Sequence, residues 1–353
     1  MKIRELQEYM KENKIDLSIF MNSSLNKKDS NLIYFSQVDL EYATLAITQS
    51  KETLFVPRLE YENVKRNSVI KDIELPKKRI SLSIKNKFKN KIKKIGVNTK
   101  ILSLEEYRQL KNIFKGAKLV DISGYCSELR ITKTKKEINY IKKACQITDK
   151  ILQNCLNHFN FKTEAEVAAY LDSQIKKNGC EPAFRTIVAS GKNASQPHYQ
   201  SKDIKLNKGF CVIDFGAKYK NYCADITRTI FIGKPSQNEI KIYNNLLNAQ
   251  QSSIERVKEN MDCSQLDNFA RKKLGKYGKN FIHSLGHGIG IDIHELPNVS
   301  NKAKNKLKNN MIFTIEPGIY VENKYGIRIE DDILLNKDKA EVLTKTTKEL
   351  IKV

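Results

Sequence analysis

The sequence predicts an α/β protein with two domains, one over residues 1–122 and one over residues 123–353. Strand-like and helix-like stretches alternate in the first part, which is the pattern of an α/β domain. In the second part, two helices followed by a β-hairpin occur twice, which indicates a structural repeat. A chain of 353 residues is long enough for two domains that each bury a core.

The N-terminal domain is predicted to begin with an amphipathic helix, because Ile3, Leu6 and Met10 recur at helical spacing. Short apolar runs then predict strands. Ser103 and Glu106 have the spacing of a capping box and predict the start of a further helix. The strands are expected at residues 17–21, 32–35, 43–48, 53–56, 95–97 and 119–122.

The C-terminal domain is predicted to contain four helices, three of which begin with a Ser or Thr three residues before a Glu. This spacing lets the hydroxyl and the carboxylate each accept a backbone N–H of the first turn. The fourth helix is expected at about 264–277. Hairpin-like segments at 210–232 and 311–335 follow the helix pairs, and each carries two acidic residues. The capping pairs are Thr134 with Glu137, Thr163 with Glu166, and Ser236 with Glu239.

Five side chains that can bind metal lie far apart in the chain, in the strings VIDFG, CADITRT, GHGIG, IEPG and RIED. They are Asp214, Asp225, His287, Glu316 and Glu330. Four carboxylates and one imidazole form an oxygen-rich set, which suits Mn²⁺, Co²⁺ or Fe²⁺ better than a thiolate zinc site does. Two divalent ions balance the four carboxylates, whereas one ion leaves an excess of negative charge. The set therefore predicts a two-metal site of the kind that catalyses hydrolysis.

Each hairpin can bring its acidic pair together. Asp214 and Asp225 lie opposite each other if the turn is centred between residues 219 and 220. The two glutamates of the second hairpin lie opposite each other if its turn is centred on Asn323. Opposed side chains on one face are about 4.5–5.5 Å apart at Cβ, and paired carboxylates at that distance need a cation between them. Arg328, two residues before the second glutamate, is expected on the same face.

One candidate histidine, His287, lies within the glycine-rich string LGHGIG, and another follows it. His287 and His294 are seven residues apart, so a regular strand would place them on opposite faces. We therefore expect a bulge or turn near residues 288–292 if both histidines serve one site.

The order of the strings VIDFG, CADITRT, GHGIGIDIHE, IEPGIY and GIRIEDD resembles the Xaa-Pro peptidases, that is, aminopeptidase P and prolidase, which have the pita-bread fold. The resemblance covers nearly the whole chain. SELRITKTKKEINYIKKA resembles the helix by which the family's chain enters the catalytic domain. ASGKNASQPHY resembles the segment that carries the family's first substrate-side histidine, here His198.

The resemblance implies a role for each of these residues. Asp225 and Glu330 would bridge two metal ions, and Asp214, His287 and Glu316 would complete the ligand set. His198 and His294 would lie beside the substrate carbonyl. Glu316 would also move a proton, and Arg328 would orient the bridging carboxylates. The ions are expected to be Mn²⁺, with Co²⁺, Fe²⁺ or Zn²⁺ as alternatives. The resemblance also implies a homodimer.

The substrates implied by the resemblance are small peptides with proline in second position. In many prolidases an arginine follows the His-Glu-x-Pro string and binds the carboxylate of the dipeptide, but here Asn298 follows Pro297. A buried carboxylate needs a cation. We therefore expect an aminopeptidase that prefers tripeptides to dipeptides, with a prolidase as the alternative.

The composition of the chain bears on its partners, its cellular location and its class. The net charge of +23 comes from lysines spread along the chain, and the run at residues 85–94 is expected to be a solvated face or loop, so neither nucleic acid nor membrane is an expected partner. Seven cysteines without a Cys-x-x-Cys pair favour a reducing cytoplasm. A non-catalytic binding protein on the same fold stays open and would lack bound metal. A creatinase and a methionine aminopeptidase fit less well, because the one lacks the full ligand set and the other lacks the first domain.

Overall fold

The computed structural model describes residues 2–23, 28–76, 79–88 and 92–353. The chain divides into two compact units, Met1–Leu129 and Arg130–Val353. The domain boundary proposed between residues 122 and 123 falls at the start of helix α6 (Ser123–Ile131). Among the described residues, no helix is long and apolar enough to cross a membrane.

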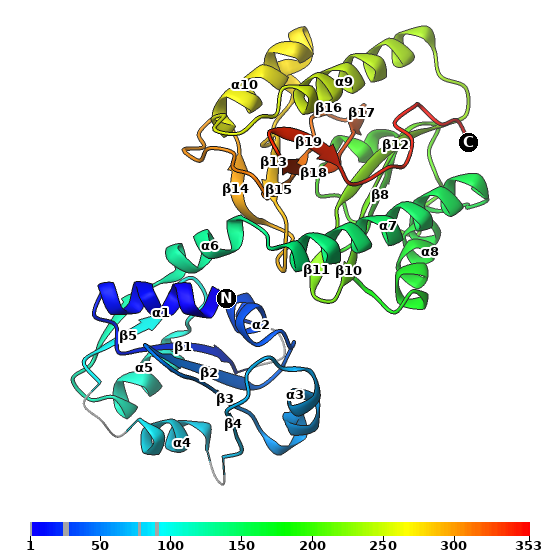
Figure 1. Cartoon of the computed structure of the whole chain (residues 1–353). Coiled ribbons are helices and arrows are strands. Elements are labelled where there is room, and N and C mark those ends of the chain that lie inside the picture. The colour runs from blue at the N-terminus through cyan, green and yellow to red at the C-terminus, as the bar shows by residue number, and fades with distance from the viewer. Residues whose placement is uncertain (1, 24–27, 77–78, 89–91) are drawn as a thin grey trace. The chain divides into compact units, whose positions relative to one another are not determined.

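The first unit is built on a mixed six-stranded sheet in the order β4-β3-β2-β1-β5-β6 (Figure 1). Strands β1 and β2 are antiparallel, as are β2 and β3, whereas β1–β5, β5–β6 and β3–β4 are parallel. Five of the six predicted strands are confirmed within one residue at each end. The strands are β1 (Leu17–Asn22), β2 (Ala43–Thr48), β3 (Glu52–Phe55), β4 (Ile73–Glu74), β5 (Lys94–Val97) and β6 (Lys118–Asp121).

The helices of the first unit correct one prediction. Residues 32–35 form part of a helix and not a strand, because Asp29 caps it by accepting a hydrogen bond from the backbone N–H of Asn31 at 2.9 Å. The capping box of Ser103 and Glu106 is confirmed. In the lysine run, Lys85 and Lys87 are exposed, while residues 89–91 lie outside the described part. The helices are α1 (Lys2–Glu12), α2 (Ser30–Ser36), α3 (Tyr61–Asn67), α4 (Ile80–Lys87) and α5 (Leu104–Ile113), with a 3₁₀ turn at Arg58–Glu60.

The second unit has two pairs of helices with strands between them (Figure 1). The pairs are α7 (Lys135–Asn157) with α8 (Glu164–Lys177), and α9 (Gln237–Glu255) with α10 (Cys263–Leu274). All three predicted capping boxes are formed. Helix α10 ends three residues earlier than predicted, because Gly275 takes a positive φ of 57° and the chain continues as a 3₁₀ helix, Gly275–Asn280.

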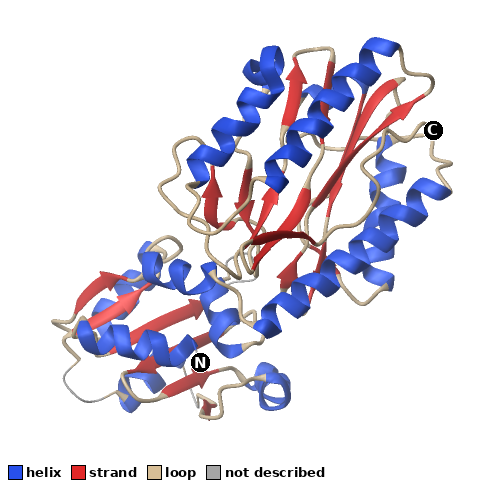
Figure 2. Cartoon of the chain, turned by 45° about the horizontal axis from the view of Figure 1, so that its top comes forward, coloured by secondary structure: helices blue, strands red, loops and turns tan. Residues whose placement is uncertain are grey.

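The strands of the second unit lie between its helices (Figure 2), and their sheets form two halves that match the predicted repeat. The first half contains the sheets β12-β9-β8 and β11-β10-β7, and the second contains β14-β13-β15-β18-β19 and β16-β17. The bounds are β7 (Glu181–Pro182), β8 (Ile187–Ser190), β9 (Gly209–Phe215), β10 (Ala217–Tyr219), β11 (Tyr222–Cys223), β12 (Ile226–Ile232), β13 (Gly286–Gly288), β14 (Glu295–Val299), β15 (Ile312–Ile315), β16 (Gly318–Val321), β17 (Tyr325–Arg328), β18 (Asp331–Asn336) and β19 (Lys339–Val342).

Each helix pair buries an apolar stripe on the strands of its own half. Leu152 and Leu171 pack with Ile213 in the first half, and Leu246 and Leu266 pack with Phe313 in the second. All seven cysteines are buried. The strands that carry the acidic residues are therefore held from behind by apolar packing.

The strand pairing of the second hairpin has the predicted register, whereas the turn of the first hairpin lies one residue later than predicted. Val321 pairs with Tyr325 around Asn323, which confirms the predicted turn. In the first hairpin the turn is centred between Lys220 and Asn221, one residue later than predicted, because both adopt positive φ, 50° and 70°. Two consecutive residues with positive φ form the tight turn that hairpins favour.

Candidate metal centre

The acidic residues lie where the strands of each hairpin pass from one sheet to another. Asp214 is next to the last residue of β9, and Asp225 lies between β11 and β12. Glu316 lies between β15 and β16, and Glu330 between β17 and β18. The two hairpins meet at this place, since the backbone N–H of Glu330 donates to the carbonyl of Thr227 at 3.1 Å. The carboxylates therefore project at the junction of the sheets.

The corrected register still brings the two aspartates to one side. Asp214 lies opposite Thr227, which is two residues after Asp225. Side chains two residues apart along a strand share a face. The close crossing of the two hairpin arms depends on Gly216, because a Cβ there would lie 1.8 Å from the carbonyl oxygen of Ala224.

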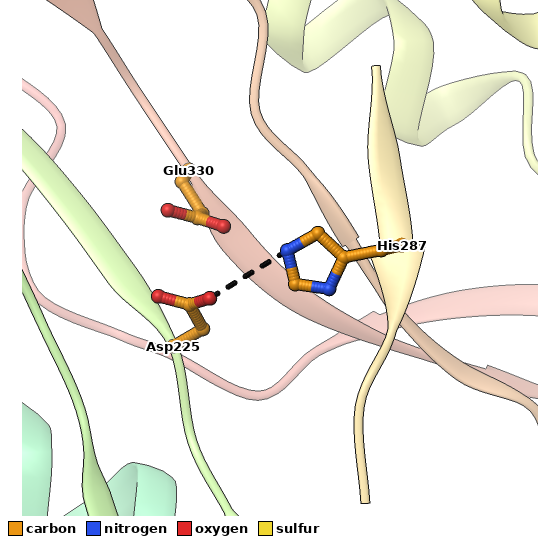
Figure 3. Close-up of side chains that lie close together, drawn as sticks. All are labelled: Asp225, His287 and Glu330. Atoms are coloured by element: carbon orange, nitrogen blue, oxygen red, sulfur yellow. Dashed lines mark ion pairs between the residues drawn. The ribbon is translucent and has the colours of Figure 1, made fainter. Parts of the chain in front are cut away.

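Three of the five predicted ligands converge. Asp225, His287 and Glu330 each offer one ligand atom within 4.8 Å of the other two, and Figure 3 shows the three side chains pointing toward one another. Nε2 of His287 lies 3.7 Å from Oδ2 of Asp225 and 3.3 Å from Oε1 of Glu316. Glu316, a third carboxylate, thus borders the same space.

His287 has the tautomer that a metal ligand requires. Its Nδ1 lies 3.2 Å from the carbonyl oxygen of Gly288. A carbonyl only accepts, so Nδ1 carries the hydrogen and Nε2 presents its lone pair to the carboxylates. The pKa of His287 is lowered to about 4, mainly by burial and to a lesser extent by the charge of His294. The ring is therefore neutral at pH 7.

Buried oxygen atoms in this space have no hydrogen-bond partner. They include Oδ1 of Asp214, Oδ1 of Asp225 and Oε1 of Glu330. A buried carboxylate oxygen that bonds nothing is costly unless a cation compensates it. The unpartnered oxygens and the free Nε2 of His287 form a hard donor set, so these residues fit divalent ions.

The electrostatics of the carboxylates support the same conclusion. Burial raises the pKa of Asp225 and Glu330 well above the usual range, and the charges of neighbouring carboxylates raise both further. Burial also raises the pKa of Glu316 to about 8. Bound divalent ions would reverse this penalty and hold the carboxylates in their ionised form.

Arg328 links Asp214 to two residues that the sequence analysis did not single out, His283 and Tyr320. Its Nη2 donates to Asp214, and its Nη1 donates to the hydroxyl of Tyr320 at 2.8 Å. The same hydroxyl lies 3.0 Å from Nε2 of His283, whose Nδ1 lies 2.8 Å from the carbonyl oxygen of Ser284. His283 therefore has its hydrogen on Nδ1 and accepts from Tyr320, which gives a continuous polar chain from Asp214 to His283.

Two threonines join the first hairpin to the second. The hydroxyl of Thr227 donates to Oε2 of Glu330 at 2.6 Å and accepts from Nε of Arg328 at 2.9 Å. The hydroxyl of Thr229 lies 2.9 Å from the carbonyl oxygen of Arg328. Both threonines lie in the string DITRT, whose alternation places them on the side of Asp225.

The alternate residues of these strands form a second polar network on the opposite side. Nη2 of Arg228 donates to Oδ1 of Asp331 at 2.7 Å, and its Nη1 donates to the carbonyl of Glu330 at 2.5 Å. The same guanidinium bonds the carbonyl of Thr346, and Lys348 bonds Asp331 at 2.7 Å. The last segment of the chain thus supports the strands behind the candidate metal centre.

The structure places His198 and His294, the two histidines predicted to face the substrate, differently. The register shifts between His287 and Gly288, which confirms the expected bulge, and the rings of His287 and His294 lie 4.3 Å apart. His198 is exposed in a turn after the 3₁₀ helix η2 (Gly191–Ser195). Its charge contributes to the lowered pKa of His294, after burial, so the two side chains are within electrostatic range.

A buried cluster of carboxylates and imidazole on a duplicated helix-and-hairpin frame defines a metallohydrolase. Residues 139–337 match the family model described as "Metallopeptidase family M24". Residues 2–132 match the one described as "Creatinase/Prolidase N-terminal domain". The chain belongs to metallopeptidase family M24. The predicted resemblance and the pita-bread fold of the second unit are confirmed, and the protein is a hydrolase.

Known proteins are similar over the whole chain. The "Xaa-Pro dipeptidase" of Pyrococcus furiosus is 38% identical and aligns over 99% of both chains. The crystal structure of the prolidase from Pyrococcus horikoshii OT3 has a TM-score of 0.90 at 37% identity, covering 99% of both chains. The crystal structure of X-Pro aminopeptidase from Thermotoga maritima MSB8 also has a TM-score of 0.90, at 33% identity, covering 96% of this chain and 98% of the other.

Proposed function

We propose that this protein is a metal-dependent Xaa-Pro dipeptidase, that is, a prolidase. The full-length similarity to the Pyrococcus furiosus dipeptidase supports this proposal most strongly. The convergence of Asp225, His287 and Glu330 supports the metal dependence. The comparisons favour the dipeptidase over the aminopeptidase that Asn298 led us to expect.

The side chains can divide the work of hydrolysis among them. When bound, divalent ions supply Lewis acidity that polarises a carbonyl and acidifies water. Glu316, whose carboxylate borders the site 3.3 Å from Nε2 of His287, would move a proton to the leaving nitrogen. His294, whose pKa is lowered by burial and then by the charge of His198, would donate a hydrogen bond to the developing oxyanion. His198 would border the substrate, and Arg328 would hold Asp214 in place.

We further propose that Asp214, Asp225, His287, Glu316 and Glu330 hold two divalent ions, with Mn²⁺ as the first candidate. The expected result is two ions per chain after the chelated protein is reloaded with Mn²⁺ or Co²⁺ and dialysed, measured by mass spectrometry of the metal. Two ions are expected because four carboxylates need two divalent charges for balance. A stoichiometry that stays at zero or one would contradict a dinuclear centre.

Substrate length tests the dipeptidase proposal directly. We expect a higher kcat/KM for an Xaa-Pro dipeptide than for the matched Xaa-Pro-Xaa tripeptide, and little turnover of the same peptides with alanine in place of proline. The measurement is the rate of release of the first residue at a fixed Mn²⁺ concentration. A preference for the tripeptide would support the aminopeptidase instead, and no turnover of any peptide by the metal-loaded protein would contradict both.

Asn298 supports the aminopeptidase as the second candidate. Its side chain is exposed, on β14 directly opposite His287. Asparagine provides no charge for the carboxylate of a dipeptide, whereas arginine can bind it through two charge-assisted hydrogen bonds. Asn298→Arg is therefore expected to raise dipeptide kcat/KM by about tenfold or more, since such a contact contributes roughly 1.5–3 kcal/mol. Tripeptide turnover, measured in parallel, should change less.

The homodimer, the cytoplasmic location and the absence of a nucleic-acid partner stay predictions. The small peptide substrate is the one partner on which the proposed function depends.

A further inference from the structure

The segment that carries His294 has little regular structure of its own. Residues 290–294 form bends between β13 and β14, outside the hydrogen-bond ladders of the sheet. The ring of His294 nevertheless lies 4.3 Å from that of His287 in an edge-on arrangement. A bend without ladder hydrogen bonds needs other contacts to hold a side chain in one place.

Those contacts come from Glu295, the residue after His294. Its carboxylate lies between two buried cations: Oε1 bonds Nη2 of Arg130, and Oε2 lies 3.1 Å from Nζ of Lys133. Nη2 of Arg130 also lies 2.6 Å from Oδ2 of Asp292. Two cations therefore meet two carboxylates, and the side chain of Lys133 is only 1% exposed.

The Glu295 carboxylate also organises the bend itself. Its Oε1 accepts a hydrogen bond from the backbone N–H of Asp292 at 3.1 Å. Gly290 leaves room for it, because a Cβ at that position would lie 2.6 Å from both carboxylate oxygens. At the other side, the backbone N–H of Cys223 donates to the carbonyl of Gly290 at 2.8 Å.

The cations are fixed to the body of the second unit. The backbone N–H of Lys133 donates to the carbonyl of Asn310 at 2.8 Å, and Thr132 forms a β-bridge with Met311. Nζ of Lys133 also donates to the carbonyl of Arg130 at 2.8 Å. Arg130 and Lys133 thus form a rigid base at the start of the segment that enters the catalytic unit.

A buried ion cluster is weak evidence for stability, because desolvation offsets much of the attraction between the charges. A cluster that joins a rigid base to an irregular bend instead restricts where the bend can lie. We propose that Glu295 is a positioning residue, which anchors the 290–294 bend to Arg130 and Lys133 and thereby holds His294 beside the metal centre. This proposal rests on the proposed function only in assigning His294 to the substrate.

Two variants disturb the anchor in different ways. Glu295→Gln keeps the shape of the side chain and removes the charge that the two cations require. Gly290→Ala keeps every charge and displaces the carboxylate by steric contact. The control is Glu341→Gln, which removes the charge from an ion pair with Lys142 whose side chains are 34% and 38% exposed.

Hydrogen–deuterium exchange of the metal-loaded protein gives a readout that needs no substrate. Faster exchange is expected in peptides that cover residues 288–296 in both anchor variants, with peptides from 209–232 and 311–335 unchanged. On an Xaa-Pro dipeptide, kcat should fall about 10- to 100-fold with little change in KM and with metal content retained, because a misplaced His294 weakens transition-state contacts. Glu341→Gln should behave as wild type in both measurements.

Unchanged exchange at 288–296 in a folded variant would overturn the proposal, as would equally faster exchange in all three peptide regions. If Glu295→Gln does not fold, the exchange rates of Gly290→Ala in the same three peptide regions test the proposal. A wild-type protein without dipeptidase activity would contradict the proposed function, while the exchange data would still test the anchor.

Discussion

Asp225→Asn is expected to lose bound metal and to lower kcat/KM on an Xaa-Pro dipeptide by at least about 10²-fold, the usual cost of removing a preorganised electrostatic contact. The substitution hardly alters the shape of the side chain, but it removes one negative charge next to His287 and Glu330. It also replaces the unpartnered Oδ1 oxygen with either a neutral oxygen or an N–H₂ group, neither of which binds a divalent ion as a carboxylate does. Metal content and turnover should be measured on the same preparation.

Asp203→Asn is the matched control, because it makes the same chemical change at an exposed residue of the same unit. It should keep both the metal and the activity. Near-normal turnover of Asp225→Asn with a full complement of metal would mean that Asp225 only supports the fold.

Replacing histidines separates a metal ligand from residues that act on the substrate. His287→Ala removes the Nε2 lone pair that faces Asp225 and Glu316, so it should weaken or empty one metal position. His294→Ala and His198→Ala should keep the metal and lower kcat/KM by about 10²-fold, since each would remove a contact made to the substrate. Metal stoichiometry and kcat/KM together distinguish the two classes.

His158 provides the control for this series, because it is exposed at the end of α7. His158→Ala should leave both measurements unchanged. If His294→Ala empties a metal position, the assignment of His287 as ligand and His294 as substrate contact is wrong.

Local signals in the sequence were reliable where one physical rule decides the outcome. The capping boxes, such as that of Thr134 and Glu137, formed as predicted because their spacing alone satisfies the first helical turn. The turn at Asn323 also formed where the pairing of the two glutamates required it. The prediction of a strand at residues 32–35 was wrong, because a short apolar run fits a buried helix as well as a strand. The cap at Asp29 distinguishes the helix from the strand.

The five metal-binding candidates could be chosen from the sequence because their side chains share one chemistry. The residues that position them could not. His283 and Tyr320 come to Arg328 only through the fold, and their local strings give no sign of that contact. The TxT alternation of Thr227 and Thr229 was a usable signal, since it places both hydroxyls on the side of Asp225, but its partner strand could not be known.

The hydrogen bond between Thr227 and Glu330 joins residues 103 positions apart, and Arg228 and Asp331 are as distant in sequence. Such contacts carry a large entropic cost, because a long loop must close before they stabilise anything. The candidate ligands are therefore dispersed in the unfolded chain, and neither hairpin alone brings them together. An ion that binds only the assembled site adds its binding free energy to that of folding. The concentration of available metal would then determine what fraction of the newly made protein stays folded. It would also determine how fast the folded protein hydrolyses peptides.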